Sequence, residues 1–255
     1  MNRYLMVTGI CLALVMAVIP VAIQAADTGK PGAVKTETSG GKMQGSHAGN
    51  GQKARAVPVY VPPKRGAPLA RVGGGSRGID DNLPYISVIT PEHVGFTSQP
   101  QPVLYWYISD AMKTRFEFAL INDDDIDPMI EVISEQEMQA GLNSINLADH
   151  GVSLEPGVAY QWSVALVADA NKRSADIVSS GQIELLELTA AQKAALQAAG
   201  ESERVTIFAR EGYWYDSFAS LSGLIASDPG NSDLRAQRAA LLEQIGLPEV
   251  SAASK

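Results

Sequence analysis

Cysteine is almost absent from this sequence. Cys11 is the single cysteine in 255 residues and lies inside an apolar run near the N-terminus. Disulfide bonds, which stabilise many small exported domains, are therefore not available, and the fold must be held together by packing alone. Ile10 occupies the position where a lipoprotein signal has a small residue, so we do not expect a lipid on Cys11.

Catalytic signatures are also scarce. The three histidines, His47, His93 and His150, show no ligand-like spacing for zinc. Neither a G-x-S-x-G nucleophile elbow nor an H-E-x-x-H motif occurs. Carboxylate pairs such as Asp80–Asp81 are too common in an acidic chain to indicate acid–base catalysis. We therefore predict no catalytic residue, no cofactor and no enzymatic activity.

One stretch, Arg71–Asp80, does match a nucleotide-binding pattern. Its Gly73, Gly75 and Gly78 give G-x-G-x-x-G. That motif binds a dinucleotide where it follows a strand, opens a helix and precedes an acidic residue by about 20 positions. The flanking residues predict neither strand nor helix, and position 98 is Ser98. We expect no nucleotide, and we interpret the glycines as a turn with positive φ or with closely approaching backbones.

The chain begins like an exported protein. Arg3 is followed by uncharged apolar residues at positions 5–23, and small residues follow, a pattern typical of a secretory signal peptide. We expect residues 1–25 to be cleaved, which leaves a periplasmic or secreted protein without a membrane span. The alternative is an uncleaved anchor, because the apolar run approaches the roughly 20 residues that span a bilayer.

The remaining chain divides into a basic arm and an acidic body. Residues 26–78 contain nine basic and two acidic side chains, whereas residues 79–255 contain ten basic and 26 acidic ones. A nucleic-acid-binding protein usually carries its basic side chains on a folded face with aromatic residues nearby. The acidic body and the export signal therefore argue against nucleic acid as a partner.

The arm itself changes in composition along its length. Residues 26–57 are predicted to be a disordered linker, because they contain too few apolar side chains to form a core. Residues 58–82 contain prolines that favour extended backbone, and they are predicted to be an ordered arm. We expect Arg65, Arg71 and Arg77 of this arm to dock on acidic side chains of the body.

Residues 83–188 carry the pattern of an all-β sandwich of the immunoglobulin or fibronectin-III type. Short apolar or alternating runs between turn residues predict about seven strands. The runs are YISVIT, VLYWYIS, RFEFALI, MIEVIS, NSINL, VAYQWSVALV and GQIELLEL. Tyr160 follows Pro156 and Gly157 at a strand start, which resembles the tyrosine corner of such sandwiches. Trp162 shares the strand face of Tyr160, so we place it in the core.

The hydrophobic period becomes helical in residues 189–248. Thr189 and Gln192 form a capping-box signature, Gly200 is expected to end the first helix, and three further helices follow. Part of this region resembles a tetratricopeptide-like hairpin. The residues at the spacings of that repeat are Gly212, Trp214, Ser217, Leu221, Leu224 and Pro229. Residues 249–255 are predicted to be a disordered tail.

The segment around Trp214 also contains two candidates for ligand contacts. Trp214 shares a helical stripe with Phe218 and Leu221, and we therefore assign it to the core. Tyr215 and Asp216 lie off this stripe and remain candidates for contact with a ligand.

A weaker candidate is a calcium site at Asp123, Asp125 and Asp127, which alternate like the start of a calcium-binding loop. Pro128 replaces the expected glycine, and Ser134 stands where a calcium loop has glutamate. We interpret this segment as a solvated hairpin turn, with calcium binding as the alternative.

The order of motifs resembles a family of exported bacterial, largely cyanobacterial proteins, DUF928. The motifs are PPKRGAPLARVGGGSRG, PVLYWYIS, RFEFALI, LEPGVAYQWSVAL, KRSADIVSSGQIE, EGYWYDSFASLSGL and LLEQIGL. They extend from Val57 to Leu247, and Ser76 stands where threonine is expected. The resemblance implies the architecture and the exported location, and it implies no chemistry and no catalytic residue.

Three functional hypotheses follow. The first is a non-enzymatic module of the cell envelope or extracellular space that engages a protein partner through the sandwich, the helical hairpin and the basic arm. The second is an enzyme that acts on cell-wall or extracellular polymer through an unrecognised site. The third is a structural protein whose basic arm anchors the acidic body to an anionic polymer.

Overall fold

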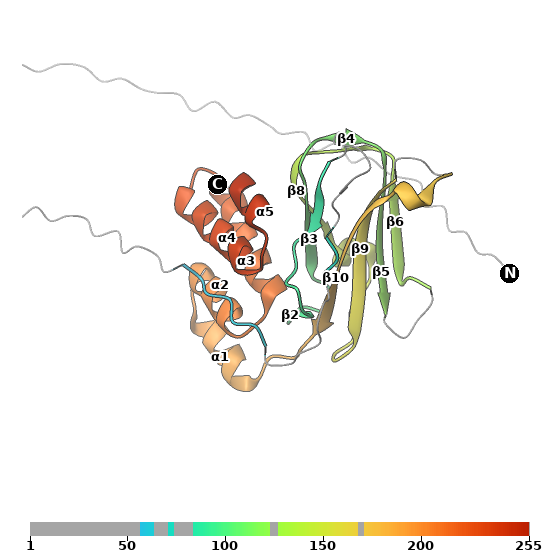
Figure 1. Cartoon of the computed structure of the whole chain (residues 1–255). Coiled ribbons are helices and arrows are strands. Elements are labelled where there is room, and N and C mark those ends of the chain that lie inside the picture. The colour runs from blue at the N-terminus through green and yellow to red at the C-terminus, as the bar shows by residue number, and fades with distance from the viewer. Residues whose placement is uncertain (1–56, 64–70, 74–83, 123–126, 168–170, 255) are drawn as a thin grey trace, which may run out of the picture. The chain divides into compact units, whose positions relative to one another are not determined.

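Strands come first and helices follow in the part of the chain that the structure describes (Figure 1). The computed structural model describes residues 57–63, 71–73, 84–122, 127–167 and 171–254. These residues belong to one unit, Gln52–Lys255. The expected signal peptide and all of the expected linker except Val57 lie outside the described residues.

The larger sheet has five strands in the order β2-β10-β9-β5-β6 (Figure 1). Its bounds are β2 (Gly95–Thr97), β10 (Ile177–Leu185), β9 (Ala159–Val167), β5 (Arg115–Asn122) and β6 (Ile130–Ser134). Neighbouring strands pair antiparallel except β2, which runs parallel to β10. The sheet therefore brings residues before Pro100 beside the last strand of the chain.

A smaller sheet has the order β1-β3-β8. Its strands are β1 (Ile86–Val88), β3 (Val103–Ile108) and β8 (Gly141–Asn146), and both pairings are antiparallel. The two-stranded pair β4 (Met112–Lys113) and β7 (Glu137–Met138) completes the strands of the described residues. Short 3-10 helices follow β8 at Leu147–His150 and precede β10 at Arg173–Ala175.

The two main sheets share one apolar core because side chains alternate along their strands. In β3 the residues Leu104, Trp106 and Ile108 are buried, while the residues between them are partly exposed. Trp106 stacks on Phe116 of the larger sheet with ring centroids 5.0 Å apart. Trp162 is fully buried, as the sequence predicted from its strand face.

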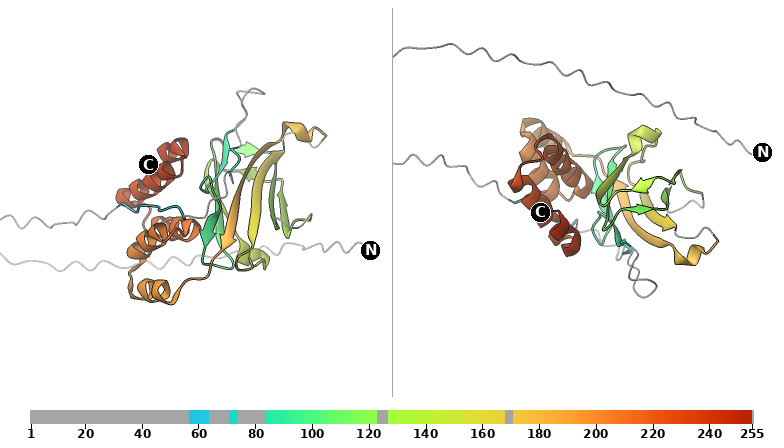
Figure 2. Two further views of the ribbon diagram at one scale, coloured as in Figure 1. Left: turned by 60° about the horizontal axis from the view of Figure 1, so that its bottom comes forward. Right: turned by 90° about the horizontal axis from the view of Figure 1, so that it is seen from above.

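Five described helices follow the strands and lie to one side of the two sheets, where they contact both the smaller sheet and the edge strand β2 of the larger one (Figure 2). They are α1 (Ala190–Ala198), α2 (Glu201–Arg210), α3 (Trp214–Ser227), α4 (Ser232–Gln244) and α5 (Pro248–Ala253). Helix α3 makes the contact, because Phe218 packs edge-on against Tyr105 of β3 at 5.2 Å. Within the described residues, none of the helices is long and apolar enough to cross a membrane.

The structure corrects two expectations about the helices. Residues 249–255 were expected to form a disordered tail, but Pro248 begins α5 and Val250 is fully buried. Proline is favourable in a first helical turn, where its missing N–H has no intrahelical partner. Gly200 was expected to end α1; instead it is the N-cap of α2 with φ −71°, and Ala199 caps α1. The capping box of Thr189 and Gln192 is confirmed.

Candidate functional site

The arm contributes an extended segment, residues 57–63, that lies against two helices (Figure 1). The Val61 N–H donates to the carbonyl of Ala209 in α2 at 3.0 Å. Gln244 of α4 holds the same segment twice: its Oε1 accepts from the Tyr60 N–H at 2.8 Å and its Nε2 donates to the Pro58 carbonyl at 3.0 Å. The arm therefore connects two helices that are separate in the sequence.

Side chains of this segment alternate between buried and exposed positions. Pro58 and Tyr60 are buried, whereas Val57, Val59 and Val61 are 52%, 61% and 46% exposed. Extended backbone places alternate side chains on opposite faces, so the three valines form one outward row. An ordered row of exposed β-branched side chains is unusual for a surface segment that has no partner.

Tyr60 anchors the segment in the main core. Its ring meets Trp214 edge-on at 5.2 Å and stacks on His93 at 5.9 Å. The Nδ1 of His93 lies 2.8 Å from the Val94 carbonyl and donates to it, which leaves Nε2 to accept from the Tyr60 hydroxyl at 3.3 Å. Burial raises the pKa of Tyr60 above its usual value, so the phenol keeps its proton and remains a donor.

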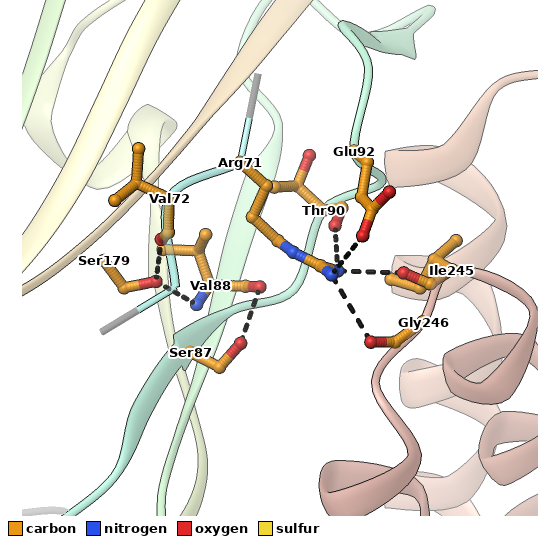
Figure 3. A network of polar contacts seen from close by, with 9 residues as sticks. All are labelled: Arg71, Val72, Ser87, Val88, Thr90, Glu92, Ser179, Ile245 and Gly246. Carbon is orange, nitrogen blue, oxygen red and sulfur yellow. Dashed lines mark hydrogen bonds and ion pairs between the residues drawn. The ribbon is translucent and has the colours of Figure 1, made fainter. Parts of the chain in front are cut away.

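Arg71 forms the second attachment of the arm (Figure 3). Its Nη1 donates to the carbonyls of Thr90 at 3.1 Å and Ile245 at 2.9 Å. Its Nη2 reaches the Gly246 carbonyl and Glu92 Oε1, both at 3.3 Å. Burial lowers the pKa of Arg71, and the charge of Glu92 opposes this shift. The guanidinium thus supplies donors to carbonyls at the end of α4, which the helix itself cannot pair.

Val72 extends the attachment onto the larger sheet (Figure 3). It exchanges two backbone hydrogen bonds with Ser180 of β10, at 2.9 and 3.1 Å. The neighbouring Ser179 hydroxyl donates to the Val72 carbonyl at 2.9 Å and accepts from the Val88 N–H at 3.0 Å. Arg71 therefore contacts the end of α4 and the segment after β1, and Val72 contacts β10, so the two residues connect these three parts of the body.

A cavity of about 230 Å³ opens where the arm meets the body. Its lining residues are Tyr60, Pro62, Pro91, Glu92, His93, Gln244, Ile245 and Gly246. The polar groups of this cavity are already engaged: both ring nitrogens of His93 form hydrogen bonds, and Glu92 pairs with Arg71. These groups hold the arm in place, and none of them is poised as a free general base.

Tyr215 is part of a buried hydrogen-bond network. Its hydroxyl accepts from Trp162 Nε1 at 2.9 Å and lies 2.9 Å from Thr90 Oγ1 and 3.0 Å from the Gln182 carbonyl. Burial raises the pKa of Tyr215, so it stays protonated. The sequence left Tyr215 as a candidate for ligand contact, but its side chain joins α3 to β9 and β10 of the larger sheet and to the segment after β1 inside the core. The backbone of Gly95 approaches this ring so closely that a Cβ added to Gly95 would lie 2.7 Å from Tyr215 Cε2.

Asp216, the other ligand candidate in α3, is also buried. Its carboxylate accepts from the Ser98 N–H at 2.9 Å and from the Ser98 hydroxyl. Burial raises the pKa of Asp216, and the hydrogen bonds from Ser98 act in the opposite direction. Asp216 therefore attaches the first turn of α3 to the segment after β2. Trp214 of the same turn is fully buried and donates from Nε1 to the Ile89 carbonyl at 2.9 Å, in agreement with its expected core position.

An ionic cluster on β5 was not anticipated from the sequence. Glu117 binds Arg173 through both carboxylate oxygens, at 2.9 and 2.6 Å, and Arg115 at 2.6 Å. The pKa of Glu117 is lowered to about 2, chiefly by the hydrogen bonds from Arg173. The hydrogen bond from Arg115 lowers it further, and burial acts in the opposite direction. The sequence signal is weak, because Arg173 and Glu117 are far apart in the chain.

Some of the remaining predicted site residues lie outside the described residues, and the others can be placed. Arg65, Gly75, Arg77, Gly78, Asp123 and Asp125 lie outside the described residues. Asp127 is exposed, and no group of three or more metal-ligating side chains occurs among the described residues. The glycines were expected to have positive φ or closely approaching backbones; Gly73 has no positive φ, and no described atom lies within 4 Å of a Cβ placed on it. The Tyr160 hydroxyl accepts from the Glu155 N–H at 3.0 Å.

Comparisons with known proteins give one informative match. A family model described as Domain of Unknown Function (DUF928) matches residues 72–254. No curated protein matches the chain. The crystal structure of a multi-domain immunophilin from Arabidopsis thaliana is similar at 7% identity, covering 76% of this chain and 98% of that chain. Its TM-score of 0.16 is too low to support an argument. The family match spans most of the chain and agrees with the resemblance seen in the motifs, so the chain belongs to the DUF928 family.

Proposed function

We propose that this protein is an exported, non-enzymatic interaction module that binds a protein partner in the cell envelope or extracellular space. One observation carries the proposal: the arm is held across α2 and α4 with Val57, Val59 and Val61 directed outward. Apolar side chains on ordered backbone cost little conformational entropy when a partner covers them. The arm and the helices beneath it would then form the binding face.

The architecture proposed for this module is an immunoglobulin- or fibronectin-III-like sandwich followed by a tetratricopeptide-like hairpin. The bond between the Tyr160 hydroxyl and the Glu155 N–H supports the first part, because a tyrosine corner has this bond to upstream backbone. The turn at Gly212 between α2 and α3, where φ is +85°, supports the second part.

Export and the lack of enzymatic activity are further parts of the proposal. The apolar run after Arg3 supports a signal peptide and a periplasmic or secreted location. The cavity beside the arm supports a non-enzymatic role, because His93 and Glu92 are engaged in holding Tyr60 and Arg71. The family description assigns no activity that would argue otherwise.

Site-specific cross-linking in the native bacterium tests the proposal. A photoreactive amino acid replaces Val59, and a matched variant carries it at Glu135, an exposed residue just after β6. We expect a defined adduct with another protein from position 59 and none from position 135. Equal adducts at both positions, or no adduct from position 59 in cells that contain the folded protein, would refute binding through this face.

A further inference from the structure

A polar cluster lies where β3, α3 and α4 meet. Tyr105 projects from β3 on the face that Phe218 of α3 covers, with their rings 5.2 Å apart. Ser222 is four residues after Phe218 and therefore lies on the same face of α3. Arg238 comes from α4 and lies close enough to Tyr105 to affect its pKa. All three residues are partly exposed, so the cluster reaches the surface.

The guanidinium of this cluster lacks a hydrogen bond. Arg238 Nε is shielded from solvent and has no hydrogen-bond partner in the part of the chain that the structure describes. Arg71, Arg115, Arg173 and Arg210 each pair with a carboxylate, whereas no described carboxylate forms an ion pair with Arg238. Shielded polar atoms normally have partners, so the unpaired guanidinium of Arg238 calls for a ligand group.

The charge of Arg238 adds to this imbalance. Burial lowers the pKa of Arg238, and the neighbouring positive charge of Arg235 acts in the same direction. Burial raises the pKa of the Tyr105 phenol, with Ser222 and Arg238 opposing the shift, so the phenol keeps its proton at neutral pH. The cluster therefore presents a guanidinium and two hydroxyl groups, and a desolvated cation without a counter-charge is costly.

We propose that Arg238, Ser222 and Tyr105 form a binding site for a carboxylate group. A guanidinium matches the planar carboxylate through two parallel hydrogen bonds, and hydroxyl groups can donate to its remaining lone pairs. A singly charged group fits better than phosphate or a polyanion, because residues 79–255 hold 26 acidic and ten basic side chains and repel multiple negative charge. This site is independent of the proposed partner-binding face at the arm.

Thermal unfolding of the full-length protein in rising sodium acetate, against sodium chloride of equal ionic strength, tests the site. We expect acetate to raise the melting temperature of the parent by a few degrees more than chloride, because a ligand that binds only the folded state stabilises it. The Arg238→Met variant should lose this acetate-specific rise. Without acetate it should melt no lower than the parent, because methionine removes an unpaired, desolvated charge.

Further variants and probes make the result decisive. Arg210→Met, which removes an exposed arginine paired with Glu211, should keep the acetate response. If Arg238→Met does not fold, Ser222→Ala serves in its place and should weaken the response. N-acetylalanine should raise the melting temperature as acetate does, and N-acetylalaninamide, which has no carboxylate, should not. A larger rise with N-acetylalanine than with acetate indicates that the site binds the carboxylate of a peptide and not a small free acid. An equal response in parent and variant, or phosphate acting as strongly as acetate, overturns the proposal.

Discussion

Tyr60 and His93 lie with their rings nearly parallel, 5.9 Å apart, and the Tyr60 hydroxyl reaches His93 Nε2 at 3.3 Å. The pair joins the arm to the segment between β1 and β2. His93 in turn is held by the Val94 carbonyl, so one contact that orients its ring does not involve the arm. A short extended segment is thus positioned by one aromatic anchor and a few backbone hydrogen bonds.

The anchor predicts a large loss of stability when its ring is removed. Tyr60→Ala leaves a cavity beside Trp214 and should lower the free energy of unfolding by about 3 kcal/mol. Tyr60→Phe keeps the ring and loses the bond to His93, so about 1 kcal/mol is expected. Urea unfolding measures both. Val59→Ala, at a position 61% exposed, is the control and should change stability by less than about 0.5 kcal/mol. Equal effects of Tyr60→Ala and Val59→Ala would show that the ring does not anchor the arm.

Arg71 predicts a second loss through unsatisfied carbonyls. Arg71→Met keeps much of the apolar stem but removes the donors to Thr90, Ile245 and Gly246, which should destabilise the protein by about 2 kcal/mol. Glu92→Gln should have a much smaller effect, because the Glu92 side chain is 71% exposed. Chemical denaturation of the two variants distinguishes them. A larger effect of Glu92→Gln would mean that the ion pair, and not the carbonyl contacts, dominates.

The arm as a whole can be tested by truncation. A chain that starts at Ile79 lacks Tyr60, Arg71 and Val72 and should melt at a clearly lower temperature than the full chain. A chain that starts at Gln52 keeps every described residue and should melt within about 1 °C of it, because surface changes rarely alter stability. Calorimetry provides the comparison. Identical melting of the Ile79 chain would mean that the arm contacts contribute no net stability.

Glu117 predicts a loss of stability in acid. Its pKa is about 2 in the folded protein, below the value of about 4.3 usual for an unfolded chain. A carboxyl with a lowered folded pKa contributes stability that is present above about pH 4.3 and disappears as the pH falls toward 2. The denaturation midpoint of the parent should therefore fall across this window more steeply than that of Glu117→Gln. Parallel curves for the two proteins would contradict the role of the arginine cluster.

Two glycines form a matched test of close packing. A Cβ on Gly95 would lie 2.7 Å from the Tyr215 ring, which its hydrogen bonds hold in place, so Gly95→Ala should destabilise the protein by about 1–3 kcal/mol. Gly223 is inside α3, and no atom of the described residues lies within 4 Å of its Cβ position, so Gly223→Ala should stabilise the protein by up to about 1 kcal/mol. Thermal melts measure both. Stabilisation by Gly95→Ala would show that Tyr215 can move.

The longer elements could be predicted because their signals are local. Alternation in β3 and β9 and the capping box at Thr189 each depend on neighbours in the sequence. The strands β2, β4 and β7 have two or three residues, too few for a period to be visible. The start of β10 was missed for another reason: Ser179 and Ser180 are polar, yet both are buried with hydrogen bonds from other strands and the arm.

The sequence by itself determined the division into a basic arm, a β-rich region and a helical region, together with the family, because composition and periodicity are properties of the chain alone. Only the tertiary structure decided that Arg71 serves three carbonyls besides a carboxylate, that Tyr215 and Asp216 are buried, and that Arg238 has no ion pair with any described carboxylate. Backbone carbonyls look alike in any sequence. Which of them a guanidinium meets depends on contacts between residues up to 175 positions apart, and folding alone brings these together.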